Sequence, residues 1–271
     1  MMMLPVAGRE TLAADIARTA VGSLYAELVL YPKPGLVSLV DNGSHTDMTA
    51  ATFMRSLFTL RHYFRAMVAA GRSDAPFSRL RTLGIDAEAR MLIATGGINT
   101  HRGAIFCLGL LCAAVGRAYG QGIVLTPAAL RAVLLIRWGD ALAAHGGGAG
   151  GAREEGARGL PSVFEAGLPA LQATLKAGRS MRHARIDALF ALMAHIDDTN
   201  VKHRGGAAGA AAVRGGAQAF IEAGGTAHPK WMEQAVALHH AFMRDRLSPG
   251  GAADLLAASC FVHGVCTRGA P

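Results

Sequence analysis

The fold class is set by residues 11–30, TLAADIARTAVGSLYAELVL. Their apolar side chains recur at the spacing of one helix face: Leu12, Ile16, Ala20, Leu24 and Leu28. This spacing predicts an α-helix, which the prolines and glycine of Tyr31–Gly35 should end. The same pattern predicts helices over residues 49–70, 83–94, 104–115, 127–144, 161–177, 186–195, 207–223 and 229–246, and a final one after Ser248.

The composition agrees with an all-α fold. Of the 271 residues, 51% are hydrophobic but only 6% are aromatic, and Ala, Leu and Gly dominate, which favours helices packed through small side chains over a sheet. No segment alternates like a strand, no repeat is obvious, and no charged or Ser/Pro-rich linker divides the chain. We therefore predict a single all-helical domain over residues 1–271, a multi-helix bundle.

The net charge of +8 would suit an anionic partner. A nucleic-acid-binding protein would be expected to carry a lysine-rich run or a known binding motif, and neither occurs. Lysine is found only at positions 33, 176, 202 and 230, and most of the excess charge is scattered arginine. The sequence therefore argues against nucleic acid and favours a nucleotide-like substrate.

The cysteines do not form a zinc signature. Cys107 and Cys112 lie in an apolar run, where buried free thiols are expected, and Cys260 and Cys266 are also wrongly spaced. The N-terminus lacks the pattern of a signal peptide, and the longest apolar run, residues 105–115, is too short for a membrane-spanning helix. We expect a cytoplasmic protein that is not bound to a membrane.

Polar residues gather at the ends of the predicted helices. The five clusters are Tyr31–Asp47, Thr95–Gly103, His145–Pro161, Asp197–Gly206 and Ser248–Asp254. The glycine-dense cluster His145–Pro161 is not expected to form regular structure. If the helices form a bundle, several of these ends could meet at one mouth, and we predict the active site there.

The cluster Asp197–Gly206 contains the most chemistry, with two adjacent carboxylates, an amide, a His, an Arg and two glycines. Carboxylates can hold a hard cation, and Arg and backbone N–H groups can hold phosphate. On a helix the two carboxylates would point about 100° apart, so both reach one metal only if the helix has ended or water bridges one of them. The alternative, a helix end followed by an Asp-Thr-Asn turn, leaves His203 and Arg204 unexplained.

The other clusters have structural alternatives. Asp41, His45 and Asp47 could bind a metal or act as acid and base, or Asp47 could cap the next helix while Asp41 makes a turn. Residues Asn99–Gly103 could hold phosphate at a helix start, or form an ordinary capped start. The Gly146–Gly151 run could close over phosphate or be a linker.

Two carboxylates interrupt otherwise apolar helical segments. Glu27 lies one turn before the Tyr31–Gly35 stretch and is expected to face the same mouth, since a buried carboxylate needs a partner. Glu88 is expected to face outward.

Five ordered motifs resemble one enzyme family. They are Tyr31–Val37, Gly43–Met48, Asn99–Phe106, Gly151–Glu154, and Asp197–Val201 with His203–Gly206. They resemble the triphosphoribosyl-dephospho-CoA synthases, also called ATP:dephospho-CoA triphosphoribosyltransferases. The segments Arg55–Leu57, Tyr63–Phe64 and Leu247–Asp254 are more similar to the form that serves malonate decarboxylase than to the form that serves citrate lyase. The chain departs from the family pattern at Lys202, where an apolar residue is usual, at Gly156 and Leu160, and in a shortened glycine loop.

The resemblance implies an unusual use of ATP. The 2′-hydroxyl of 3′-dephospho-CoA attacks C1 of the ATP ribose, adenine leaves, and the triphosphate stays on the transferred sugar. The product is the prosthetic-group precursor of an acyl carrier protein, which a carrier-protein transferase receives. Glycosyl transfer of this kind passes through an oxocarbenium-like transition state that nearby carboxylates stabilise.

Roles for the matching residues are expected from this resemblance. Magnesium is assigned to Asp197 and Asp198 with Asp47 as a further ligand, and Glu27 or His45 is the expected base, so that Glu27, His45, Asp47 and Asp198 make up the catalytic set. Substrate and phosphate contacts are assigned to Lys33, Asn99, His101, Arg102, Arg153, Asn200, His203 and Arg204. Two other functions remain open: a helical magnesium-dependent phosphohydrolase or ADP-ribose glycosidase, and a non-enzymatic protein that binds acyl carrier protein.

Overall fold

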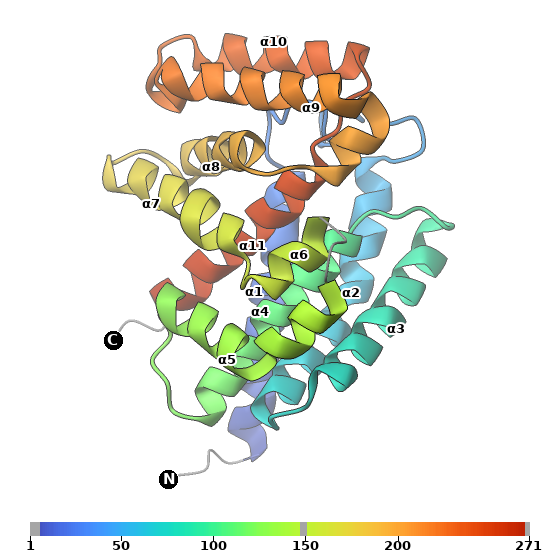
Figure 1. Cartoon of the computed structure of the whole chain (residues 1–271), viewed down its shortest axis with the longest axis vertical. Coiled ribbons are helices and arrows are strands. Elements are labelled where there is room, and N and C mark those ends of the chain that lie inside the picture. Colours follow the sequence, from blue (N-terminus) through green and yellow to red (C-terminus); the bar gives the residue numbers. More distant parts are fainter. Residues whose placement is uncertain (1–5, 147–150, 269–271) are drawn as a thin grey trace.

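The apolar spacing produces helices throughout. The computed structural model describes residues 6–146 and 151–268, and within these ranges the chain forms 11 α-helices and no strand (Figure 1), which confirms the all-α prediction. The helices are α1 (Val6–Leu28), α2 (Ala50–Arg72), α3 (Phe77–Thr95), α4 (Arg102–Gly120), α5 (Pro127–Gly146), α6 (Gly151–Ala157), α7 (Leu168–Lys176), α8 (Met181–His195), α9 (Thr199–Glu222), α10 (Trp231–Arg244) and α11 (Gly250–Arg268). A π-helical turn, Val163–Gly167, leads into α7, and a 3₁₀ turn, Gly225–Ala227, follows α9.

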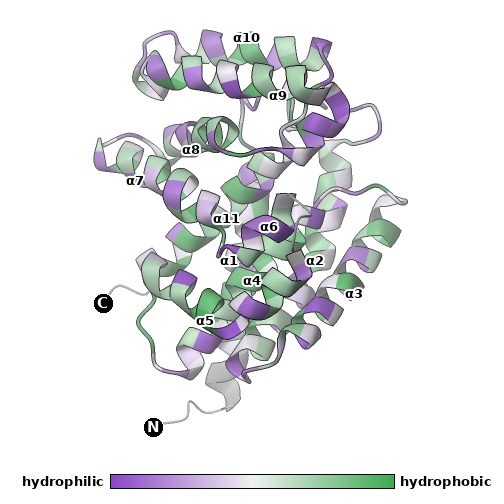
Figure 2. Ribbon diagram, in the orientation of Figure 1, coloured by the Kyte–Doolittle hydropathy of each residue, from purple (hydrophilic) through white to green (hydrophobic). Residues whose placement is uncertain are grey.

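The core is built around α4 and α11. Helix α2 packs against α1, α3 and α4, while α11 packs against α1, α4 and α8. Helix α10 packs on α9, and this pair lies at one end of the molecule (Figure 1). Figure 2 shows α4 and α11 as mainly hydrophobic ribbons in the interior, whereas α9 and α10 alternate between hydrophilic and hydrophobic residues.

Small residues let α2 and α4 approach closely. A Cβ added at Gly71 would overlap the backbone of Ala113, and one at Gly116 would overlap the carbonyl oxygen of Val68. The two backbones therefore touch at positions where only glycine fits. At this contact, small residues are required by the close approach of the two helices.

Helix α4 is longer than the apolar run that predicts it. Helix α4 and residues Gly250–Thr267 of α11 are both long and apolar enough to cross a membrane by length and composition alone. However, 72% of the first segment and 50% of the second are buried inside the structure, as expected of core helices. Cys107 and Cys112 lie buried on α4 as free thiols, as predicted.

The expectation that the whole His145–Pro161 cluster is irregular is wrong. Residues Gly151–Ala157 form α6, because Gly151 turns the chain with φ +62° and strong helix formers follow it. Gly156 lies so close to the Phe106 ring that a Cβ there would overlap it. The middle of the predicted glycine loop, residues 147–150, lies outside the described residues.

The Asp197–Gly206 cluster is also more helical than expected. Helix α9 begins at Thr199, and Asp198 is its N-cap. The helical path is broken only at Gly206, whose φ of 61° and ψ of −156° are not helical. The residues expected to form a catalytic loop therefore lie at the N-cap and in the first two turns of α9, and the predicted helix 207–223 continues beyond the break.

Candidate active site

One large cavity opens where helix ends meet. It has a volume of about 1120 Å³ and is lined by residues from all five polar clusters, including His45, Asn99, Arg153, Asp198 and Asp254. The predicted convergence of these clusters is confirmed. At this size the cavity exceeds the usual range for a single small ligand, about 300–1,000 Å³.

Most residues predicted for the site line this cavity. They are Glu27, His45, Asn99, His101, Arg102, Arg153, Asp197, Asp198, Asn200, His203 and Arg204. Lys33 and Asp47 are not part of its lining. Asp47 lies beside the cavity, with Oδ1 3.7 Å from Nδ1 of His45, and it does not cap α2, because Thr49 does so.

Lys33 forms a buried ion pair with Glu27. Its side chain is only 1% exposed and forms an ion pair with the Glu27 carboxylate at the end of α1. Burial lowers the pKa of Lys33, and the charge of Glu27 opposes that shift. Glu27 faces the cavity as predicted, whereas Lys33 stands behind it and neutralises its charge.

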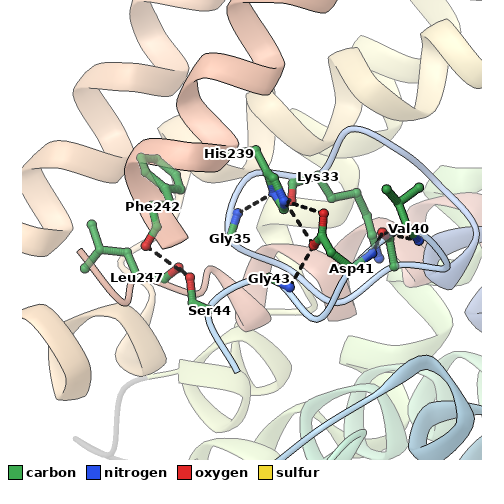
Figure 3. A network of polar contacts seen from close by, with 10 residues as sticks. Lys33, Gly35, Val40, Asp41, Gly43, Ser44, His239, Phe242 and Leu247 are labelled. Atoms are coloured by element: carbon green, nitrogen blue, oxygen red, sulfur yellow. Dashed lines mark hydrogen bonds and ion pairs between the residues drawn. The ribbon is translucent and has the colours of Figure 1, made fainter. Parts of the chain in front are cut away.

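The loop between α1 and α2 is fastened to α10. The buried His239 ring on α10 places Nε2 3.0 Å from both carboxylate oxygens of Asp41, and Nδ1 accepts the N–H of Gly35 at 3.2 Å (Figure 3). Asp41 also accepts the N–H of Gly43 at 2.8 Å, which confirms the predicted turn. Ser44 donates to the carbonyl oxygen of Leu247, 2.6 Å away. These contacts fix the loop that carries Lys33 and His45.

His45 is held at both ring nitrogens. Nε2 lies 2.8 Å from Oγ of Ser248, and Nδ1 accepts a hydrogen bond from Arg204 at 3.0 Å. Arg204 also donates to the carbonyl oxygen of Ser44 at 3.1 Å. Burial and the neighbouring Arg204 lower the pKa of His45. His45 is therefore a neutral, oriented side chain that links the loop, α9 and the start of α11.

The adjacent carboxylates Asp197 and Asp198 have different environments. The buried Asp198 accepts the N–H of Asn200 at 2.9 Å and that of Ala252 at 3.3 Å, so one carboxylate caps both α9 and α11. Burial raises the pKa of Asp198, and these N–H donors oppose the shift. Asp197 is 58% exposed and forms an ion pair with Lys202.

This arrangement bears on the predicted magnesium ligands. Across residues 6–146 and 151–268, no three His, Cys, Asp or Glu side chains are grouped so that they could hold a metal ion. Asp198 accepts backbone N–H groups and Asp197 pairs with Lys202, so the assignment of magnesium to Asp197 and Asp198, with Asp47 as a further ligand, stays a prediction.

His101 and Arg102 sit at the start of α4. The buried His101 has Nδ1 2.6 Å from Oγ of Ser56, while Nε2 has no hydrogen-bond partner among the described residues. Burial lowers the pKa of His101 to about 3, so the ring is neutral. Arg102 donates from Nε to Glu88 at 2.6 Å, so the expectation that Glu88 merely faces outward is wrong.

Asp254 also lines the cavity, although the sequence pattern did not single it out as a site residue. Burial raises its pKa well above the ordinary value, with further contributions from the charges of Glu27 and Asp198. Asp254 could have been found in the same way as Glu27, because it is a lone carboxylate in an otherwise apolar segment, Ala252–Phe261.

A basic group adds three residues without an assigned role, Arg81, His145 and Arg158, to the predicted Arg153. Arg81 on α3, His145 on α5, and Arg153 and Arg158 beside it also line the cavity. Burial lowers the pKa of His145, and the charges of Arg153 and Arg81 lower it further. These residues come from three separate helices and the turn after α6, so sequence spacing alone could not have grouped them.

Comparison with known families agrees with this geometry. The sequence profile described as ATP:dephospho-CoA triphosphoribosyl transferase matches residues 13–136 and 135–270, nearly the whole chain. The chain belongs to this family. It is therefore an enzyme, a transferase, and the resemblance stated from the five motifs is confirmed.

Individual relatives cover almost the same length. A protein of Acinetobacter calcoaceticus, named "Probable 2-(5''-triphosphoribosyl)-3'-dephosphocoenzyme-A synthase", is 39% identical over 262 residues, which cover 91% of this chain and 88% of the relative. Proteins with the same name from Stutzerimonas stutzeri and Pseudomonas aeruginosa are each 41% identical, over 92% and 93% of this chain and 91% and 92% of the relative, respectively. No solved structure matches the chain.

Proposed function

We propose that the enzyme transfers the 5-triphosphoribosyl group of ATP to the 2′-hydroxyl of 3′-dephospho-CoA and releases adenine. The observation that carries this proposal is the cavity of about 1120 Å³ whose wall combines carboxylates with arginines. Two nucleotide substrates need a large shared site, anionic groups near the sugar carbon that becomes cationic, and cations near the phosphates.

The cationic and polar side chains proposed to bind phosphate come from α9, from the start of α4, and from α3 and α6. Arg204 and His203 extend from the first turns of α9, and Arg102 and Asn99 stand at the start of α4. Arg153, with Arg81, approaches from the α3 and α6 side. We assign the triphosphate and the diphosphate of the acceptor to these groups, with Asn200 as a polar neighbour, while Lys33 supports Glu27 from behind.

Glu27 and His101 are assigned to the reacting sugar and base. The Glu27 carboxylate, neutralised only from behind by Lys33, is suited to stabilise positive charge that develops at the ribose. His101 is neutral, so it suits an uncharged partner such as a ribose hydroxyl or an adenine ring nitrogen better than a phosphate. Its unpartnered Nε2 is the atom available for that contact.

Magnesium is proposed to enter bound to ATP. Mg²⁺ is usually held by one or two carboxylates together with substrate phosphates, and it keeps several waters. A protein cage of three carboxylates is therefore not required. Asp197 is an exposed carboxylate on the wall that a hydrated ion could meet.

The product is proposed to pass to a carrier-protein transferase and then to the acyl carrier protein of malonate decarboxylase. The segments Arg55–Leu57, Tyr63–Phe64 and Leu247–Asp254 support this pathway over citrate lyase by their resemblance. We place the enzyme in the cytoplasm, where the free thiols found among the described residues would stay reduced. Offering the product to both apo carrier proteins, each with its transferase, would distinguish the pathways.

One assay tests the proposed activity. The protein is incubated with magnesium, ATP and 3′-dephospho-CoA, and free adenine is measured by chromatography. Adenine that appears only when both substrates are present, together with a product of the summed mass minus adenine, is the expected result. Release of phosphate without adenine, or no turnover, would overturn the proposal.

A further inference from the structure

Asp254 occupies a position that the fold prepares for a carboxylate. It lies in the second turn of α11, faces the cavity, and accepts the backbone N–H of Ala104 at the start of α4. Gly103 leaves room for it, because a Cβ at position 103 would overlap Oδ2 of Asp254. The carboxylate is thus held by one backbone donor at a helix N-terminus, and no side-chain partner is recorded for it among the described residues.

Three other proton acceptors that line the cavity already have partners. Glu27 is paired with Lys33, and Asp198 accepts backbone N–H groups from two helices. The acceptor nitrogen of His45 takes the hydrogen bond from Arg204. In each of these three groups a cation or hydrogen-bond donor stabilises the unprotonated form and so weakens it as a base.

Further candidates are excluded by pairing or by position. Glu88 is bound by Arg102, and Glu155 accepts from the hydroxyl of Ser162 at 2.6 Å. Glu154, His195 and His203 are exposed, as are Asp197 and Glu165, and water competes there for the substrate proton. The pKa of His101 is lowered to about 3 and that of His145 is also lowered, so both rings are weaker bases than an ordinary histidine. Asp254 is the carboxylate that remains on the inner wall.

We propose that Asp254 is the general base that takes the proton from the attacking hydroxyl of the acceptor substrate. This inference rests on the proposed function, since it names the residue that activates the 2′-hydroxyl. In the step, the hydroxyl proton moves to a carboxylate oxygen of Asp254 and the hydroxyl oxygen forms the new bond to C1 of the ribose. The bond from C1 to the adenine nitrogen breaks, its electron pair leaves with adenine, and adenine takes up one proton from solvent.

The electrostatic environment suits this role. Burial is the main cause that raises the pKa of Asp254, and the charges of Glu27 on α1 and Asp198 at the start of α9 raise it further, while the Ala104 N–H on α4 opposes them. The thiol of Cys107 on α4 also faces it. A general base is most effective when its pKa lies near the working pH, and an ordinary aspartate would be too weak a base.

Replacing Asp254→Asn tests the role with little change of shape, because the amide oxygen can still accept the Ala104 N–H. We expect kcat for adenine release to fall by about 10²–10⁴-fold while KM for ATP and for 3′-dephospho-CoA stays unchanged. We also expect the rise of kcat with pH in the wild-type enzyme to be absent in the variant. Glu27→Gln should keep that rise, and Asp245→Asn, at an exposed carboxylate outside the cavity, should behave as wild type.

Three outcomes separate this inference from the proposed function. If the wild-type enzyme releases no adenine, the proposed function fails. If it does, but Asp254→Asn keeps most of its kcat or its pH-dependent rise, Asp254 is not the base.

Should the Asn variant fail to fold, Gly103→Ala serves instead, because its methyl group displaces the carboxylate without removing it. Loss of kcat in that folded variant supports the inference, and wild-type kcat refutes it.

Discussion

Nε2 of His239 lies 3.0 Å from both carboxylate oxygens of Asp41, although 198 residues separate the two in the sequence. This contact ties α10, which otherwise packs on α9, to the loop that carries His45 and Lys33 (Figure 3). The loop has no regular secondary structure, so its shape depends on such contacts.

His239→Ala should therefore loosen the loop. The variant leaves Asp41 and the Gly35 N–H without their partner, and we expect the free energy of unfolding to fall by about 1–3 kcal/mol. Urea denaturation measures this loss. His240→Ala, at the exposed neighbouring position, is the matched control and should stay within about 0.5 kcal/mol of wild type. Equal stability of the two variants would show that the contact does not hold the loop.

The buried pair Lys33 and Glu27 should show strong coupling. Lys33→Met leaves the Glu27 carboxylate buried without a counter-charge, and we expect a loss of about 3–5 kcal/mol in the free energy of unfolding. Adding Glu27→Leu removes that stranded charge and should recover much of the loss. Denaturation of both single variants and the double variant measures the coupling. Additive losses in the double variant would mean that the two side chains do not depend on each other.

Substitution of Asp198 should destabilise the protein more than substitution of Asp197. Asp198→Ala removes the acceptor for backbone N–H groups of α9 and α11, and each lost cap costs about 1 kcal/mol. Asp197→Ala breaks only an exposed ion pair and should cost less than about 1 kcal/mol. The magnesium concentration for half-maximal activity should be unchanged in Asp198→Ala. A large rise there would assign Asp198 to the metal rather than to the caps.

The Asp254 carboxylate should make stability fall as pH rises. Its pKa in the folded protein is raised above the ordinary 3.8, so the folded state binds a proton more tightly than the unfolded state does. Its contribution to stability is complete below the ordinary pKa and is lost as pH rises through the folded value. Asp254→Asn lacks this loss, so its melting temperature should increasingly exceed that of wild type as pH rises from about 4. A constant difference across the pH range would contradict this assignment.

The sequence was sufficient for the helices and for the place where they meet. Apolar spacing predicted α1, α2, α4 and α5 closely, because each has a continuous buried face. The polar clusters at the helix ends then pointed correctly to one cavity. A helix end leaves backbone N–H or C=O groups without helical partners, so polar residues there can build a binding site. Such clusters can be recognised from neighbouring residues in the sequence.

The errors came from contacts that depend on the tertiary structure. Asp197 and Asp198 are neighbours in sequence, yet only Asp198 is buried, because the start of α11 packs against it. The sequence suggested that Lys33 binds phosphate. Its ion pair with Glu27 could not be foreseen, because the pair forms only when the loop folds back onto α1. Helix α6 was missed because glycine content predicted an irregular chain, while close packing against Phe106 made Gly156 suitable for a helix.

Gly206 divides α9 into two helical segments that are offset from one another by its non-helical dihedral angles. The first segment sets the directions of His203 and Arg204 relative to Asp198, and the second sets the face that meets α10. Inserting or deleting a residue beyond Gly206 would rotate the α10-facing side by about 100° without turning the cavity-facing side. The turn at Gly206 thus separates the part of α9 that shapes the cavity from the part that carries α10.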